Sequence, residues 1–106
     1  MGINTKICLV TGGSRGIGRG IVNVLSDRGY KVAFTYNRER QTAQDLENKL
    51  NNNGGNVKSF QMSIESRESI ISVIDKITKY YNGSISVLIN NAAISQEKPF
   101  ENITDM

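Results

Sequence analysis

The chain has 106 residues, one cysteine and no histidine, and its formal net charge is +3 at pH 7. That length suits one domain or part of one, and the cysteine and histidine counts exclude a zinc site built from those two residue types. The charges are scattered, no apolar run is long enough to cross a membrane, and the first residues lack the apolar core of a signal peptide. We therefore expect a cytoplasmic protein with no nucleic-acid, membrane or metal partner.

The first expected elements are a buried parallel strand over residues 6–10, a glycine-rich turn and a helix. In the strand, Cys8 is expected to be a small core side chain. In the helix, apolar residues recur with the i, i+4, i+7, i+8 spacing of a helix that packs on a sheet, at Ile17, Ile21, Val24 and Leu25. Gly29 stands where such a helix would end.

The rest of the chain continues the alternation of strands and helices. The pattern predicts strands over 31–36, 57–62 and 85–90, a helix over 41–50, and a further helix whose apolar residues are Ile70, Val73, Ile74 and Ile77. The strand over 57–62 is weakly hydrophobic and is expected at an edge. This alternation predicts an α/β fold, namely a Rossmann-type parallel sheet with helices on both faces, and right-handed crossovers place its strands in the order 3-2-1-4.

The last residues, 104–106, look like the N-cap and first turn of another helix. The fourth strand would also keep an unpaired edge and an uncovered apolar face. We therefore expect residues 1–106 to be a single, truncated Rossmann domain that is incomplete at its C-terminus.

The turn after the first strand reads Thr11-Gly12-Gly13-Ser14-Arg15-Gly16-Ile17-Gly18. A helix N-terminus presents unpaired N–H groups and a partial positive charge, and glycines let a phosphate approach the backbone without meeting a Cβ. The turn therefore predicts binding of a nucleotide diphosphate. Its spacing is G-x-x-x-G-x-G rather than the common G-x-G-x-x-G, and an ordinary strand–turn–helix with flexible glycines is the alternative.

This turn and a second motif together resemble the short-chain dehydrogenase/reductase family. The turn matches the family pattern T-G-x-x-x-G-I-G at every defined position. Asn90-Asn91-Ala92-Ala93 follows the apolar strand and matches the family pattern N-N-A-G except at Ala93. The sequence T-G-G-S-R-G-I-G is shared with the 3-oxoacyl thioester reductases of the family. The resemblance covers essentially the whole chain.

The resemblance implies a set of cofactor contacts. Glycines of the turn would contact the pyrophosphate, and the backbone of Ile17 would lie beside them. Ser14 and Arg15 would flank the adenosine ribose. Where the family has an aspartate for the adenine amino group this chain has Ser63, and a second usual aspartate is Ser86. The candidate cofactor-binding residues are Gly12, Ser14, Arg15, Gly16, Ile17, Gly18, Asn37, Arg38, Ser63, Ile64, Asn90 and Ala92.

The end of the second strand bears on the choice between NADP and NAD. NAD enzymes usually carry a carboxylate there that accepts from the ribose 2′-hydroxyl and would repel a 2′-phosphate. Here Tyr36 is nearest that position, and Arg38 follows with a guanidinium that can pair with a phosphate. Arg15 can approach the same place from the glycine turn. We therefore predict NADP(H) as the cofactor; the alternative is that both arginines are solvated surface charges.

The resemblance also says which catalytic groups to look for, because the family reduces carbonyls with a serine and a Tyr-x-x-x-Lys pair. Four residues after its tyrosines this chain has Phe34, Arg40, Ser84 and Ile85, so no catalytic residue is assigned. The predicted function is that of the N-terminal cofactor-binding part of an NADPH-dependent carbonyl reductase. Its longer parent would be a homotetramer acting on a 3-oxoacyl thioester or a related small carbonyl or acyl-carrier substrate.

Two other functions stay open at this point. The chain could be a non-catalytic NADP-binding or regulatory module that ends naturally near residue 106. A Rossmann-type methyltransferase is a third possibility, but it would give no reason for Arg15 together with Arg38, or for the Asn90-Asn91-Ala92-Ala93 motif.

Overall fold

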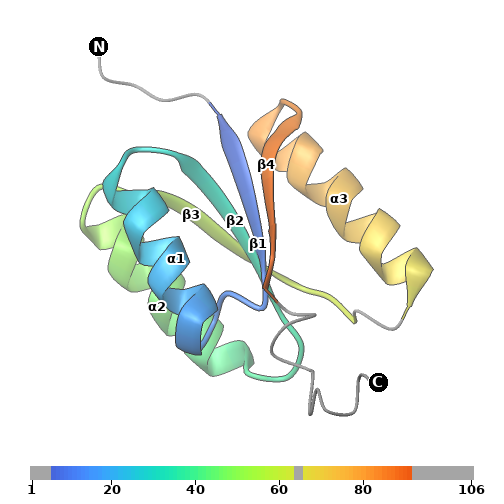
Figure 1. The fold of residues 1–106 in the computed structure, drawn as a ribbon, viewed down its shortest axis with the longest axis horizontal. Helices are drawn as coiled ribbons and strands as arrows, with labels where there is room; N and C mark the ends of the chain where they lie inside the picture. Colours follow the sequence, from blue (N-terminus) through green and yellow to red (C-terminus); the bar gives the residue numbers. More distant parts are fainter. Residues whose placement is uncertain (1–5, 64–65, 92–106) are drawn as a thin grey trace.

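The computed structural model describes residues 6–63 and 66–91, which form a four-stranded parallel sheet with three helices (Figure 1). The elements in chain order are β1 (Ile7–Thr11), α1 (Gly16–Asp27), β2 (Lys31–Tyr36), α2 (Arg40–Asn52), β3 (Asn56–Gln61), α3 (Arg67–Tyr81) and β4 (Ile85–Asn90). The strand order is β3-β2-β1-β4, with every neighbouring pair parallel. The predicted fold class, the strand order and the edge position of the third strand are therefore confirmed.

The sheet is covered by helices on both faces, with α1 and α2 on one side and α3 on the other (Figure 1). One core cluster joins Val32 and Phe34 of β2 to α1 and α2, and a second joins Ala33 of the same strand to α3. Successive strand residues point to opposite faces, so a strand covered on both faces must be apolar throughout. The continuous burial of β1, including Cys8 at 1% exposure, confirms the expected buried strand.

Local signals account for the ends of α3. The Ser66 hydroxyl accepts a hydrogen bond from the Ser69 N–H at 3.1 Å, which caps the helix. Glu68 lies in the first turn and Lys79 in the last, where their charges complement the helix dipole. The helix ends at Asn82, which adopts the left-handed conformation with φ of 56°.

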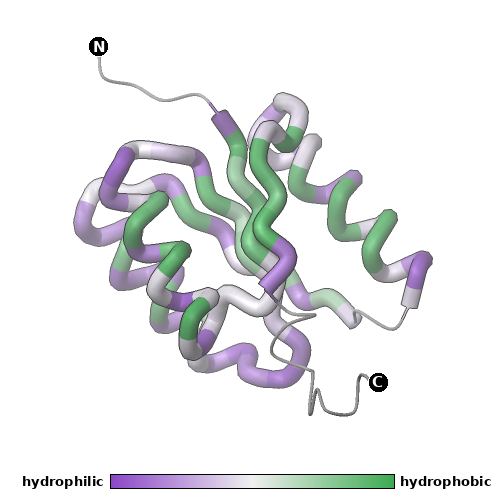
Figure 2. The backbone as a smooth tube through the Cα atoms, viewed as in Figure 1, coloured by the Kyte–Doolittle hydropathy of each residue, from purple (hydrophilic) through white to green (hydrophobic). Residues whose placement is uncertain are grey.

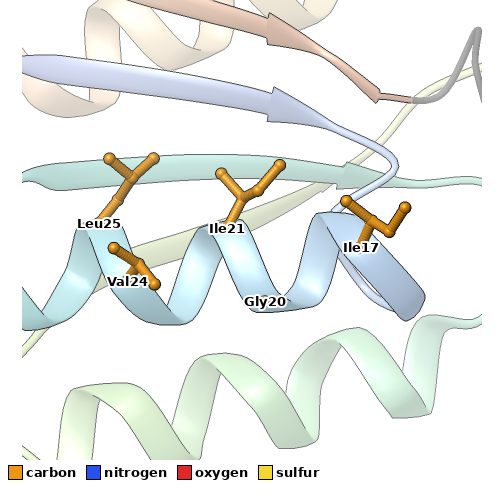
Figure 3. A pocket seen from close by; sticks show the side chains of 5 residues that line it. All are labelled: Ile17, Gly20, Ile21, Val24 and Leu25. Atoms are coloured by element: carbon orange, nitrogen blue, oxygen red, sulfur yellow. The ribbon is translucent and has the colours of Figure 1, made fainter.

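The expected packing of α1 is wrong in part. The residues of α1 that are buried are Gly18, Val22 and Ser26, whereas Ile17 is 73% exposed and Val24 is 52% exposed. Ile21 and Leu25 are half-buried and pack against the core as expected, so the expectation fails for Ile17 and Val24 alone. Ile17, Ile21, Val24 and Leu25 line a shallow apolar hollow (Figure 3).

Apolar side chains are also exposed on β4. In the described part of the chain β4 is an edge strand, and its Val87 and Leu88 are 36% and 62% exposed. Figure 2 shows hydrophobic residues along both β1 and β4. Exposed apolar surface of this kind is typical of a face that another segment covers. None of the helices described is both long and apolar enough to span a membrane.

Tyr81 ties α3 to two strands. Its hydroxyl donates to the main-chain oxygens of Val32 and Asn56, each at 3.0 Å. Burial, together with the neighbouring Tyr80 and Glu47, raises the pKa of Tyr81 well above its ordinary value. Tyr80 beside it is 54% exposed, so of the two neighbouring tyrosines only Tyr81 is in the core.

We expect Tyr81→Phe to lower the free energy of unfolding by about 1–2 kcal/mol, because two strand carbonyls lose a buried donor. Denaturant unfolding measures this, and Tyr80→Phe, whose exposed hydroxyl has no hydrogen bond to a described residue, is the control. The pKa of Tyr81 is raised in the folded state. Its contribution to the free energy of unfolding is therefore complete below the unfolded pKa of about 10 and is lost as the pH rises above that value. If the free energy of unfolding falls equally at alkaline pH in Tyr81→Phe and in the native chain, this explanation is wrong.

Candidate functional site

The carboxyl ends of the four parallel strands meet at one edge of the sheet, and the predicted cofactor-binding residues gather there. The glycine turn follows β1, Asn37 and Arg38 follow β2, Ser63 comes two residues after β3, and Asn90 ends β4. The chain order reverses between β1 and β4, and ligands of open α/β sheets bind beside such a reversal. Two further candidates, Ile64 and Ala92, lie outside the described residues.

The glycine turn is fixed to the neighbouring strand by Thr35. The Gly12 N–H donates to the Thr35 hydroxyl at 3.0 Å, and the Gly13 N–H donates to the Thr35 main-chain oxygen at 3.0 Å. Gly12 has a φ of 68°, a left-handed conformation that glycine adopts without a steric penalty. Thr35 was not among the predicted site residues, although it is the buried polar residue near the end of β2.

Gly18 is required by close packing beneath the turn. A Cβ at this position would overlap the Gly12 carbonyl oxygen and come within 2.5 Å of the Asn91 side-chain nitrogen. That nitrogen, Nδ2, donates to the Gly12 oxygen at 3.1 Å. The first turn of α1, the glycine turn and the residue after β4 are thereby locked together. Asn91 was also missed as a site residue, although it is part of the motif noted in the sequence.

Gly16 is required for a different reason. Its φ is 60°, and a Cβ built on it would meet nothing within 4 Å. The outer side of the turn is therefore open to a ligand. Glycine is needed at position 16 because of the left-handed backbone conformation, whereas Gly18 is needed because there is no room for a Cβ.

The N-terminus of α1 is prepared for an anion. Its N-cap residue Arg15 makes no side-chain hydrogen bond to the helix, and no acidic residue lies in its first turn. The amide groups of that turn therefore keep the partial positive charge of a helix start. Ser14 beside them is only 4% exposed, and its hydroxyl has no hydrogen-bond partner within 6–63 and 66–91. These features fit a phosphate-bearing ligand.

The ends of β1 and β4 are joined by side chains. The Thr11 hydroxyl donates to Asn90 Oδ1 at 3.1 Å, and the two residues are direct partners in the strand register. The Asn90 side chain therefore serves to hold the two strand ends together at the floor of the site.

Two arginines lie where the turn faces the end of β2. Arg15 Nη1 pairs with Glu39 Oε2 at 3.1 Å, so Arg15 does approach the segment after β2. The exposed Arg38 side chain makes no ion pair or hydrogen bond to another described residue. Glu39, the first carboxylate after β2, was not among the predicted site residues.

Ser63 follows β3 and is half-buried. Its N–H already donates to the Ser69 hydroxyl at 3.0 Å. The Ser63 hydroxyl has no hydrogen bond to a described residue, so it is the group at this position that can meet a ligand. Across residues 6–63 and 66–91 no three histidine, cysteine, aspartate or glutamate side chains gather as metal ligands would.

The chain is similar in sequence to one family of known proteins. A family model described as short chain dehydrogenase matches residues 6–106. The chain is 40% identical over 97 residues to the 3-oxoacyl-acyl-carrier-protein reductase FabG of Escherichia coli and 38% identical over 97 residues to that of Vibrio cholerae. Each alignment covers 92% of this chain, and the chain spans only 38% of the length of either relative.

A solved structure agrees with the sequence relatives. A short chain dehydrogenase from Burkholderia cenocepacia, crystallised in complex with NADP, matches with a TM-score of 0.76 and 28% identity. The match covers 83% of this chain and 36% of that one.

Proposed function

Because the chain belongs to the short-chain dehydrogenase family, a family of oxidoreductases, we propose that it is the N-terminal cofactor-binding part of an NADPH-dependent carbonyl reductase. The observation that carries the proposal is the uncapped start of α1 beneath an open glycine turn, at the strand reversal between β1 and β4. The amides of this helix start would hold the cofactor's pyrophosphate. When bound, the nicotinamide supplies the hydride that reduces the carbonyl.

Arginine chemistry supports NADP(H) rather than NAD(H). Arg38 and Arg15 would pair with the 2′-phosphate, since a guanidinium forms short, charge-assisted hydrogen bonds to phosphate. The residue at the end of β2 is Tyr36, which is 6% exposed, so no carboxylate stands at the position that would repel this phosphate. The NADP complex of the Burkholderia cenocepacia relative is in line with this choice.

Further protein beyond this chain would supply the rest of the reductase. The relatives are more than twice as long, and the Tyr-x-x-x-Lys pair is absent from the 106 residues. The exposed apolar side chains of α1 and β4 would be covered by that further part. We propose that the complete protein is a homotetramer acting on a 3-oxoacyl thioester or a related carbonyl substrate.

The proposal is tested by titrating NADPH and NADH into the full-length gene product and into the chain of residues 1–106. We expect the full-length protein to bind NADPH more tightly than NADH, and the 106-residue chain to show no oxidation of NADPH with a carbonyl substrate. Absence of binding by either dinucleotide to the full-length protein would end the proposal. Turnover by the 106-residue chain would instead contradict the assignment of catalysis to a further part.

A further inference from the structure

We propose that Glu39 is an internal competitor of the cofactor's 2′-phosphate: its carboxylate pairs with Arg15 and must release that guanidinium when NADP(H) binds. Glu39 would thereby set how strongly the site prefers NADP(H) over NAD(H). The inference rests on the proposed function, because it concerns the same dinucleotide site.

The first observation is the place of the ion pair. Arg15 is the N-cap residue of α1 and Glu39 is the N-cap residue of α2, and their side chains meet at 3.1 Å although they lie 24 residues apart in sequence. The two helices begin beside the carboxyl ends of β1 and β2, which are neighbours in the sheet. The pair therefore joins the starts of the two helices, where a ribose 2′-substituent would lie.

The second observation is what the Glu39 side chain does not do. It makes no capping hydrogen bond to the N-terminus of α2, although it stands at the cap position. Its carboxylate pairs with the Arg15 guanidinium instead, so the side chain contributes no cap to the helix. The carboxylate holds a guanidinium, the group that would attract a phosphate.

The charge count at this place explains the competition. Arg15 and Arg38 bring two positive charges, and the Glu39 carboxylate removes the effect of one of them. A 2′-phosphate that enters must displace the carboxylate from Arg15 and then lie close to a like charge. A 2′-hydroxyl meets no such repulsion and can donate a hydrogen bond to the same carboxylate. Glu39 therefore penalises NADP(H) and tolerates NAD(H).

The expected effect is modest because the pair is accessible to solvent, with side-chain exposures of 68% for Arg15 and 36% for Glu39. Exposed ion pairs contribute little to stability, and salt screens them. We expect Glu39→Gln to raise the ratio of NADPH to NADH affinity by about threefold to tenfold at low ionic strength, and by less at high ionic strength.

The test is calorimetric titration of the full-length gene product with NADPH, NADH, 2′,5′-ADP and 5′-AMP. The last two ligands differ only by the 2′-phosphate and so report on that group without the nicotinamide. Asp45→Asn is the matched control, because Asp45 is an exposed carboxylate on the same helix and its loss changes the net charge equally. We expect it to leave both affinity ratios unchanged. Circular dichroism melts check that each variant is folded.

A double-mutant cycle separates the specific pair from a general charge effect. If Glu39 acts through Arg15, Glu39→Gln loses most of its effect on NADPH affinity in an Arg15→Met background. An unchanged ratio in Glu39→Gln, or an equal rise in Asp45→Asn, would overturn the inference while the proposed function stands. Failure of the unaltered protein to bind any of the dinucleotides would overturn the proposed function itself.

Discussion

Gly18→Ala is expected to weaken NADPH binding by about fivefold to 150-fold, the affinity equivalent of a loop strain of about 1–3 kcal/mol. The new Cβ would overlap the Gly12 carbonyl and crowd the Asn91 amide that donates to it. The carbonyl belongs to the backbone, so the glycine turn itself has to move. A displaced turn no longer presents the amides of α1 to the pyrophosphate. Titration of the full-length protein with NADPH measures the loss.

The matched control is Gly20→Ala on the same helix. A Cβ at Gly20 meets nothing within 4 Å, so binding should be unchanged and the helix slightly stabilised by about 0.5–1 kcal/mol. Thermal melts of both variants distinguish a displaced turn from an unfolded protein. If Gly18→Ala binds NADPH as the unaltered protein does, the close packing beneath the turn does not matter for the cofactor.

Arg38→Asp is expected to shift cofactor preference toward NADH, with a change of about 100-fold in the ratio of the two affinities. The substitution removes a charge-assisted hydrogen bond to the 2′-phosphate, which contributes about 1.5–3 kcal/mol to binding. It also places a carboxylate there that repels this phosphate and can accept a hydrogen bond from a 2′-hydroxyl. Parallel titrations with NADPH and NADH give the ratio.

Arg67→Asp is the control for Arg38→Asp. Arg67 is exposed and begins α3, which packs on the face of the sheet opposite to α1 and α2, so Arg67→Asp makes the same charge change on the other face. Its affinity ratio should stay that of the unaltered protein. Equal ratios in both variants would mean that Arg38 is a solvated surface charge, as the alternative interpretation of the sequence held.

Much of the architecture follows from short stretches of sequence. Apolar runs such as Val32 to Phe34 predict strands buried on both faces, and a glycine turn followed by an apolar periodicity predicts the start of α1. Once strands and helices alternate, the preference for right-handed crossovers leaves few topologies, and the order β3-β2-β1-β4 is one of them. The glycine turn could also be recognised from the sequence, because its motif is contiguous and its backbone conformation depends on glycines only a few residues apart.

The direction of α1's apolar face could not be read from its spacing. Ile17, Ile21, Val24 and Leu25 make a regular stripe, yet only Ile21 and Leu25 pack against the core, and the buried row of the helix is Gly18, Val22 and Ser26. Periodicity shows that a helix has an apolar side but not which neighbour that side meets. Here the core lies between the buried row and one side of the stripe, so Ile17 and Val24 on the other side stay exposed.

The sequence by itself therefore determined the elements, the parallel sheet and the place of the glycine turn between β1 and α1, because each depends on local conformation and on the apolar pattern. The tertiary structure alone decided that Thr35 anchors the turn, that Asn91 bonds to Gly12, and that Glu39 pairs with Arg15. These contacts join residues 23, 79 and 24 positions apart. They arise only when the strand order brings separate strand ends to one edge, and no local pattern encodes which side chains then meet.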